Sequence, residues 1–413
     1  MTTATIISQG NELLWGDVLD TNAMWLSKQL FELGVQTTHR QTIGDHEAEL
    51  SDAFAQIAGT VDLCLCTGGL GPTTDDHTIA AIAKAAKAEL ILWPEILEHI
   101  ENLFKKMNRP MAGSNEKQAW LPKHAEIFQN PVGTAPGFAL KIKSTHFICL
   151  PGPPHELKTV FSRSIRPLID ALPNNTRKEL IIARVFGLGE SQLQERLGSI
   201  PEGVLDIGYR AALSEVAVKC ELKPKTTPDQ RQSIKKWLHE CIGTSLYTID
   251  NAEQTPRSLV SVVATLLSET AQSLVTAESC TGGQLSALCT TESGASAWFQ
   301  GGLITYSNAS KVQLLNVPVS LIEKHGAVSS EVASSMAQNA RVLLKSSFAL
   351  STTGIAGPSG ATQGKPLGTV YIALATPQTT LVKRLQLRGS RGRVQATAAL
   401  AALNLLRKHL IKR

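Results

Sequence analysis

The sequence predicts an α/β protein in which two α/β domains with parallel or mixed sheets are joined by a small α+β module. In both long parts of the chain, short apolar runs lead into glycine-rich loops and then into segments with helical spacing of apolar residues. Between about 171 and 250 the order changes to strand, helix, strand, strand, helix, strand. We therefore predict domains at residues 1–170, 171–250 and 251–413.

Length and composition support several hydrophobic cores and exclude some classes of function. The chain has 413 residues, 43% of them hydrophobic, and a formal net charge of +5, which is too small to suggest a nucleic-acid-coating surface. Its seven cysteines lack paired CxxC spacing, which indicates reduced thiols and a cytoplasmic location. No apolar run approaches the roughly 18 residues of a spanning helix, and no basic leader begins the chain, so we expect neither export nor membrane insertion.

The first domain alternates strands, loops and helices. Its first expected elements are a strand at 3–7, a loop at 8–20, a helix from Asn22 to Gly34, a strand at 61–66, a loop at 67–77 and a helix at 78–88. Asn22 is the expected helix cap and Gly34 the stop. Cys64 and Cys66 alternate within a strand, so both should pack on one face rather than bind metal.

The loop at 67–77 is the candidate nucleotide-binding loop of this domain. Its candidate residues are Gly68, Gly69, Gly71 and Thr73. Glycines let backbone amides approach a phosphate, and the adjacent carboxylates of Asp75 and Asp76 can hold a divalent cation. Alternatively, the two aspartates are acids favoured by a helix dipole. Glycine and proline also occur in the loops at 130–138 and 150–156. Together with the loops at 8–20 and 67–77, these are expected to form a nucleotide pocket.

The middle module reads as a split βαβ, KH-like unit. The expected elements are strands at 179–185, 205–211, 215–222 and 245–249 and helices at 190–197 and 228–241. It lacks a GxxG clamp and a strip of stacking aromatics, so a spacer or interaction role is favoured over nucleic-acid binding. Residues 250–256 are the expected linker.

The last domain places three hydroxyl groups at the ends of expected strands. Its expected elements are helices at 259–270, from 284, from 308, at 330–344 and after 393, strands at 273–277, 301–306 and 347–352, and a strand pair at 368–376 and 381–387. Ser279, Tyr306 and Thr353 follow or end the three single strands. Because the carboxyl ends of parallel strands share one edge of a sheet, these groups should converge.

Ser279 is the candidate nucleophile of this edge. Amides at the start of the following helix could stabilise an oxyanion, and Lys311 could act as base if burial lowers its pKa. Tyr306 would relay the proton or hold the lysine. The alternatives are that Ser279 or Thr281 only caps the helix, and that Lys311 is an ordinary solvated lysine. Cys280 is a rival nucleophile, but no histidine is offered as its partner.

A second glycine-rich loop, 354–360, suits an anion. The candidate substrate-binding residues are Thr353, Gly354, Gly357 and Arg393. With Ser279, Lys311 and Tyr306, this loop suggests acyl-type hydrolysis of a phosphorylated small molecule.

Several long motifs carry a resemblance to a known family. They are Glu12–Leu14, Asp20–Asn22, Thr67–Asp76, Asn115–Ala119, Gly133–Phe138 and Leu150–Pro154 in the first domain, and Thr276–Gly283, Tyr306–Asn308, Lys311 and Thr353–Pro358 in the last. The last domain closely resembles the C-terminal domain of the competence/damage-inducible CinA family. The first is similar to the molybdopterin-binding-like domain of that family.

The resemblance implies a nicotinamide mononucleotide deamidase, which forms nicotinic acid mononucleotide and ammonia in pyridine-nucleotide recycling. It implies that Ser279 is the nucleophile, that Lys311 and Tyr306 transfer protons, and that Thr353 and Arg393 hold the substrate. No cofactor is expected for this reaction. For the first domain the resemblance implies metal-dependent hydrolysis of ADP-ribose, with Asp75 and Asp76 as the candidate ligands. We also expect a homodimer.

One departure from the family pattern concerns the first domain. Where the family usually has an aspartate before Glu12, this chain has Asn11, which replaces a metal-adjacent carboxylate with an amide. The alternative function is therefore a nucleotide-binding or scaffold protein with little turnover.

Overall fold

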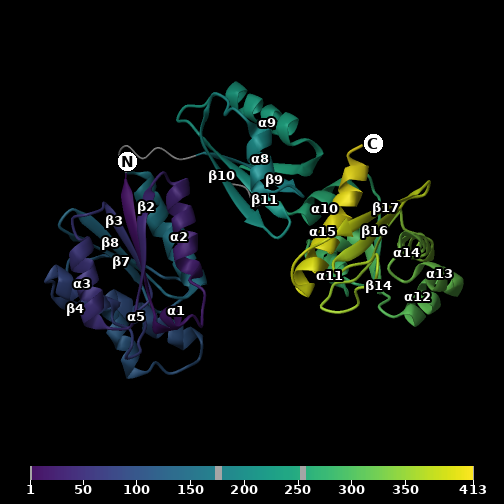
Figure 1. Cartoon of the computed structure of the whole chain (residues 1–413). Helices are drawn as coiled ribbons and strands as arrows, with labels where there is room; N and C mark the ends of the chain where they lie inside the picture. The colour runs from purple at the N-terminus through teal and green to yellow at the C-terminus, as the bar shows by residue number, and fades with distance from the viewer. Residues whose placement is uncertain (1, 173–178, 252–256, 413) are drawn as a thin grey trace. The chain divides into compact units, whose positions relative to one another are not determined.

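The computed structural model describes residues 2–172, 179–251 and 257–412, and its contacts divide the chain into two compact units, Met1–Glu179 and Leu180–Arg413 (Figure 1). Most of the linker expected at 250–256 lies outside the described residues. Within the described ranges no helix is long and apolar enough to cross a membrane.

The first unit is built on one mixed sheet. Its strands are β1 (Thr3–Gln9), β2 (Gln36–Ile43), β3 (Leu63–Thr67), β6 (Glu126–Phe128), β7 (Gly137–Ile142) and β8 (Thr145–Leu150), and a separate pair is β4 (Leu90–Leu92) with β5 (Trp120–Pro122). Its helices are α1 (Asn11–Trp15), α2 (Thr21–Glu32), α3 (Glu47–Ile57), α4 (Thr78–Ala86), α5 (Pro94–Lys106), α6 (Pro154–Val160) and α7 (Arg166–Asp170). The strand order is β2-β1-β3-β8-β7-β6, with β2, β1, β3 and β8 parallel.

Helices cover both faces of this sheet, as expected for an α/β domain. Apolar side chains of α2 and α6 pack on one face, and those of α3, α4 and α5 pack on the other. Cys64 and Cys66 are fully buried in the second of these layers, which confirms that they share one face of β3. The parallel strands place the loops after β1, β3 and β8 at one edge.

Two local predictions for this unit were wrong. The loop expected at 8–20 contains the short helix α1. Asp20, not Asn22, caps α2, because its carboxylate accepts a hydrogen bond from Ala23 N at 2.8 Å. The Asn22 amide instead donates to Gly152 O at 2.7 Å and to Thr67 Oγ1 at 3.0 Å, so it ties the end of β3 to the loop after β8.

The second unit begins with the small α+β module. Its elements are β9 (Leu180–Phe186), α8 (Glu190–Leu197), β10 (Val204–Ala212), β11 (Glu215–Leu222), α9 (Pro228–Ile242) and β12 (Leu246–Asn251), which confirms the predicted order. The antiparallel sheet has the order β10-β11-β9-β12, and apolar residues of α8 and α9 pack on it.

The rest of the second unit is a three-layer α/β/α fold. Its strands are β13 (Leu274–Glu278), β14 (Phe299–Ile304), β15 (Phe348–Gly354), β16 (Thr369–Ala375) and β17 (Thr380–Gln386). Its helices are α10 (Leu259–Glu269), α11 (Gln284–Thr290), α12 (Asn308–Leu315), α13 (Val319–His325), α14 (Ser330–Leu343) and α15 (Arg391–Leu410). The strand order is β14-β13-β15-β16-β17, in which β14, β13 and β15 are parallel and the predicted pair β16–β17 is antiparallel.

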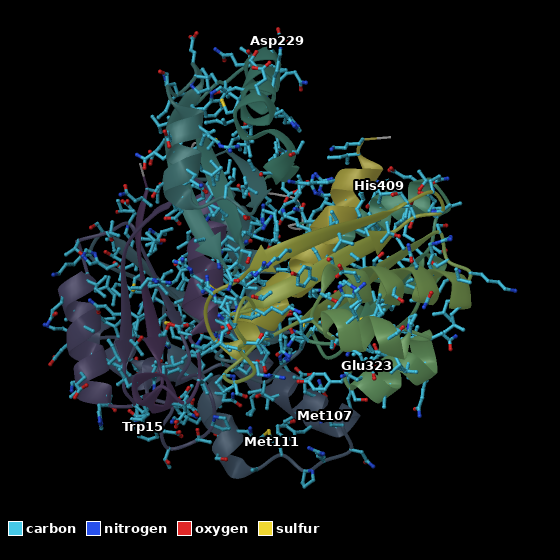
Figure 2. All side chains as sticks on the ribbon, turned by 45° about the vertical axis from the view of Figure 1, so that its right-hand side comes forward. Trp15, Met107, Met111, Asp229, Glu323 and His409 are labelled. Carbon is cyan, nitrogen blue, oxygen red and sulfur yellow. The ribbon has the colours of Figure 1, made fainter. Side chains whose placement is uncertain are left out.

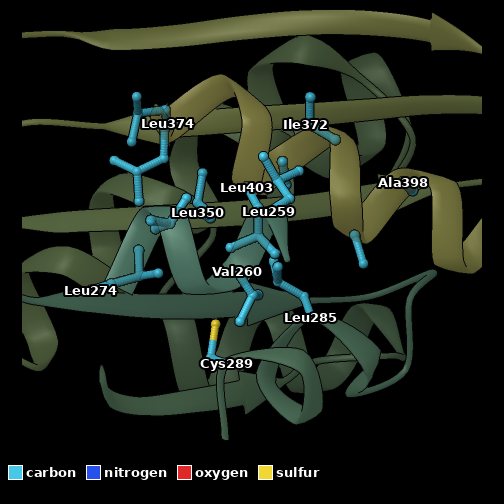
Figure 3. Close-up of a cluster of buried hydrophobic side chains, with 14 of the residues drawn as sticks. Leu259, Val260, Leu274, Leu285, Cys289, Leu350, Ile372, Leu374, Ala398 and Leu403 are labelled. Carbon is cyan, nitrogen blue, oxygen red and sulfur yellow. The ribbon is translucent and has the colours of Figure 1, made fainter. Parts of the chain in front are cut away.

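The core of this fold lies on both faces of the sheet. Figure 3 shows one layer, in which Leu259 of α10, Leu285 of α11 and Leu403 of α15 meet Leu350 and Ile372 of the sheet. The helices α12, α13 and α14 cover the opposite face. Both layers hold the strands rigidly, so the residues at their carboxyl ends start from fixed positions.

Candidate active site

The turn that carries Ser279 lies between β13 and α11, at the shared edge of the three parallel strands. Ser279 N donates to Thr352 O of β15 at 2.9 Å, and Thr305 N, just after β14, donates to Glu278 O at 2.7 Å. These bonds tie the turn to both neighbouring strands. The three strand ends therefore lie together, but their hydroxyl groups do not converge as expected. Ser279 Oγ contacts Lys311, whereas the Tyr306 phenol bonds to Arg391 and the Thr353 hydroxyl to Ala327 O.

Ser279 and Lys311 form a close pair at this edge. Lys311 Nζ lies 3.0 Å from Ser279 Oγ, and it also donates to the carbonyl oxygens of Thr305 and Tyr306 at 2.9 and 3.1 Å. Ser279 is 8% exposed and Lys311 is 1% exposed, so Lys311 is not an ordinary solvated lysine. All three partners are neutral, and burial lowers the pKa of the Lys311 ammonium to about 8.

This pair can transfer a proton near neutral pH. With a pKa of about 8, roughly one Lys311 side chain in ten is neutral at pH 7. A neutral amine at 3.0 Å from the hydroxyl oxygen is within reach of its proton. Such an arrangement suits a serine nucleophile with a lysine base.

Cys280 is poorly suited to act as the nucleophile. Its side chain is 4% exposed, and burial raises the pKa of the thiol to about 12. The thiolate, which is the reactive form, is therefore scarce at neutral pH. The Cys280 carbonyl accepts a hydrogen bond from Gln395 Nε2 of α15 at 2.8 Å, so the main chain of this residue helps to hold the turn.

Glu278 organises the start of α11. Its fully buried carboxylate accepts five hydrogen bonds. The donors are the backbone amides of Gly283, Leu285 and Ser286 and the hydroxyls of Thr281 and Ser286. A buried carboxylate needs such donors, and here they come from the helix end. Glu278 thus fixes the start of α11 directly after the turn that carries Ser279.

The same contacts correct two expectations about the turn. The N-cap of α11 is Gly283, so neither Ser279 nor Thr281 caps this helix with its side chain. The first amides of α11 donate to Glu278, so they are not available to an oxyanion as expected. In the described part of the chain, the amides of Cys280 and Thr281 donate to no backbone oxygen and become the candidates.

Tyr306 links the serine site to α15. Its phenol oxygen accepts a hydrogen bond from Arg391 Nη2 at 2.7 Å, and Arg391 Nη1 donates to Gly357 O at the same distance. Only the backbone carbonyl of Tyr306 contacts Lys311. The Tyr306 side chain is 58% exposed, so it is positioned beside Arg391 where a ligand could reach both.

The other predicted substrate-binding residues have different partners. Arg393 Nη2 donates to Leu213 O of the middle module at 3.2 Å, so Arg391 rather than Arg393 reaches Tyr306 and Gly357. Thr353 is 1% exposed and donates to Ala327 O at 2.8 Å. A Cβ on Gly354 would lie 2.8 Å from Thr369 O, so this glycine permits close pairing of β15 with β16.

Sequence reasoning missed Arg391 and Glu278, although each had a local signal. Ser390 is the N-cap of α15 and accepts a hydrogen bond from Arg393 N. A serine cap at 390 makes Arg391 the first helical residue, and this fixes the directions in which the side chains of Arg391 and Arg393 project from the helix. Glu278 ends a fully buried strand, and a carboxylate there requires buried donors.

The first unit contains a separate pocket of about 260 Å³ at the edge of its parallel strands. Residues after β1, β3 and β8 line it, including the predicted Gly68, Gly69, Asp75 and Asp76. Gly71 and Thr73 are not among the lining residues. The fourth expected loop, 130–138, packs against Glu156, which accepts from Asn130 Nδ2 at 2.6 Å and lies where a Cβ on Gly133 would be.

Gln9 accounts for the glycines at the start of the β3 loop. It is 5% exposed and its amide donates to Asp45 Oδ1 at 2.8 Å and to Asp75 O at 3.0 Å, while its oxygen accepts from the Thr78 hydroxyl. A Cβ on Gly69 would lie 1.7 Å from this oxygen, and one on Gly68 would lie 2.7 Å from Gln9 O. Both glycines have positive φ. The packing of Gln9 and the backbone conformation therefore require both glycines, whether or not a phosphate binds.

The carboxylates of the pocket do not form a metal site by themselves. Those in the lining are Glu12, Asp20, Asp45, Asp75 and Asp76. Asp76 Oδ2 accepts hydrogen bonds from the backbone and hydroxyl of Thr73. Among the residues that the structure describes, no three His, Cys, Asp or Glu side chains are arranged to hold an ion. A metal at Asp75 and Asp76 would need ligands from a bound molecule.

Asn11 faces the main chain rather than this pocket. Its side-chain oxygen accepts from Asp45 N at 3.3 Å, and its own backbone N donates to Asp45 Oδ2 at 2.9 Å. The amide therefore lies next to a carboxylate without the repulsion that an aspartate would bring.

Comparisons with known proteins match both large domains. Residues 256–410 match the CinA C-terminal domain, and residues 5–171 match a family described as a probable molybdopterin binding domain. A CinA-like protein from Syntrophomonas wolfei is 39% identical over 99% of each chain. A CinA-like protein from Shewanella frigidimarina is 38% identical over 98% of this chain and 96% of its own.

Solved structures of the same superfamily also align. A CinA superfamily protein from Klebsiella pneumoniae is 31% identical over 38% of this chain and 97% of its own, with a TM-score of 0.37. The CinA protein from Thermoplasma acidophilum is 30% identical over 41% of this chain and 99% of its own, with a TM-score of 0.38. The full-length identities, the two domain matches and the order of the domains agree, and the chain belongs to the CinA family.

Proposed function

We propose that the C-terminal domain hydrolyses the carboxamide of nicotinamide mononucleotide to give nicotinic acid mononucleotide and ammonia. The observation that carries this proposal is the 3.0 Å contact between Ser279 Oγ and Lys311 Nζ, in a site where burial lowers the lysine pKa to about 8. An amide is a poor electrophile and needs an activated nucleophile, which this pair supplies.

The reaction proceeds through an acyl-enzyme. Neutral Lys311 takes the hydroxyl proton as Ser279 Oγ attacks the carboxamide carbon, and the amides of Cys280 and Thr281 stabilise the oxyanion. As the C–N bond breaks, Lys311 returns the proton to the leaving nitrogen and ammonia departs. Lys311 then deprotonates a water that attacks the ester, which releases the carboxylic acid and restores the Ser279 hydroxyl. This sequence needs no cofactor.

Arg391 supports the choice of an anionic substrate. Its guanidinium lies at the loop of Gly357 beside the exposed Tyr306 phenol. A guanidinium with planar donors suits a phosphate, and a half-exposed phenol suits the face of an aromatic ring. Nicotinamide mononucleotide carries both groups.

The direct test of this proposal is to trap the intermediate. We expect the protein to release ammonia from nicotinamide mononucleotide with and without a chelator, and rapid acid quenching to leave an acyl group on the peptide that contains Ser279. Mass spectrometry would locate that group. Binding of the nucleotide by calorimetry without ammonia release would instead support the binding or scaffold function.

A second candidate activity, cleavage of ADP-ribose, belongs to the first unit. The pocket at the ends of β1, β3 and β8 favours it, because ligands of open α/β sheets bind at this edge. If it is active, ADP-ribose is cleaved, a chelator stops the cleavage, and Asp75→Ala lowers it by about tenfold or more. The Ser279→Ala variant should keep this activity, since its substitution lies in the other unit. Chelator-resistant cleavage would contradict the metal at Asp75 and Asp76.

A further inference from the structure

The tip of the β10–β11 hairpin contacts the first turns of α15. The two strands pair up to Ala212 and Glu215, which leaves Leu213 and Ser214 as a two-residue turn. Ser214 Oγ donates to Thr397 Oγ1 at 2.9 Å, and Arg393 Nη2 donates to Leu213 O at 3.2 Å. Both turn residues therefore bond to the helix that carries Arg391.

These contacts and those of the serine site lie on different sides of α15. Arg393 and Thr397 are four residues apart and share one side of the helix. Arg391 and Gln395 are also four residues apart. Each lies two residues before its counterpart in the first pair, which places it about 200° away around the helix axis. Arg391 reaches Tyr306 and Gly357, and Gln395 reaches Cys280 O. The start of α15 thus lies between the hairpin tip and the serine turn.

Further hydrogen bonds fix the hairpin tip within the middle module and connect the module to the far end of α15. Gly187 N donates to Ser214 O at 3.0 Å, and Ala211 N donates to Glu190 Oε1 at 3.1 Å, so the hairpin tip is fixed within the module. At the far end of α15, Arg407 is 2% exposed and donates to the carbonyl oxygens of Thr244 and Leu246. The module therefore fixes α15 near both ends.

We propose that the middle module positions α15, and through it Arg391 and Gln395, for binding at the serine site. Leu213, Ser214, Arg393 and Thr397 act as positioning residues in this scheme, because they act through α15. The identity of the bound molecule rests on the proposed deamidase function. The mechanical link between the hairpin tip and the helix does not.

The test uses the full chain with the double substitution Arg393→Ala and Thr397→Val. We expect faster hydrogen exchange in peptides covering 391–397 and 354–360. We also expect KM for nicotinamide mononucleotide to rise about three- to tenfold, which corresponds to the loss of one or two hydrogen bonds, with kcat little changed. Melting of the whole protein, followed by circular dichroism, reports whether the variant folds normally.

A control variant and a double-mutant cycle test whether the effect arises from the contact between the hairpin tip and α15. Lys236 lies exposed on α9 of the same module and pairs with Glu240, so Lys236→Ala should change neither exchange at 391–397 nor KM. When Arg391→Ala is already present, adding Arg393→Ala should raise KM by a smaller factor than it does alone.

Three outcomes would overturn the inference: unchanged exchange and KM in the double variant, equal changes in the Lys236→Ala control, or fully additive effects of Arg391→Ala and Arg393→Ala. If the wild type released no ammonia, the proposed function would fail by itself. The exchange of the 391–397 peptide would still decide whether the hairpin holds the helix.

Discussion

The Ser279→Ala variant is expected to lose ammonia release from nicotinamide mononucleotide by about 10⁴-fold or more while it still binds the nucleotide. The hydroxyl contributes the bond-forming oxygen, so no neighbouring group replaces it. Removal of one oxygen from a site that is held mainly by main-chain bonds should leave the fold intact. Steady-state ammonia release and calorimetric binding are the two measurements.

Cys280→Ala is the matched control for this prediction. It changes the adjacent side chain, whose buried thiol has a pKa of about 12. We expect this variant to retain most of the turnover and to lose about 1–2 kcal/mol of stability for the buried sulfur. Loss of turnover in Cys280→Ala with retention in Ser279→Ala would show that the thiol is the nucleophile and would reject the proposed mechanism.

Lys311→Met is expected to lower kcat by about 10³-fold, because it removes the base and keeps a side chain of similar length in a buried position. Lys311→Arg keeps the positive charge but cannot accept a proton near neutral pH, so it should be equally inactive. Recovery of turnover by the arginine variant alone would indicate that the site needs a charge rather than a base.

The pH dependence of the wild type provides an independent measurement of the same group. Lys311 must be neutral to take the proton, and its pKa is about 8. Turnover should therefore rise by about tenfold per pH unit below 8 and level off above it. A profile that falls as pH increases from 6 to 8 would contradict the assignment of Lys311 as base.

Sequence patterns were sufficient for the fold and for the central pair of the site. Apolar runs of strand length followed by glycine-rich turns located β13 and β15, and the segment 301–306 before a helix cap at Ser307 located β14. Parallel pairing of these strands explains why Ser279 and Lys311 meet. The spacing of Lys311 within α12 alone did not show its burial. That depends on how α12 packs on the sheet.

Side-chain partners were harder to predict, because they depend on the direction in which each residue leaves its element. Arg391 and Arg393 are two residues apart, yet one faces Tyr306 and the other faces the middle module. Gln9 occupies the space that the missing side chains of Gly68 and Gly69 leave open. From the glycine spacing alone, we expected a phosphate in that space. Trp15, in a segment expected to be a loop, lies on α1 and is 73% exposed (Figure 2).

The carboxylate of Glu278 has a consequence for the direction in which a substrate can lie. It already satisfies the amides at the start of α11, so this helix end offers no net attraction for an anion. The charge of Lys311 is buried against Ser279 and two carbonyl oxygens, whereas Arg391 carries its charge on the α15 side beside the exposed Tyr306. In the proposed reaction, an elongated molecule with a neutral amide at one end and a phosphate at the other therefore binds with its amide at Ser279 and its phosphate towards Arg391.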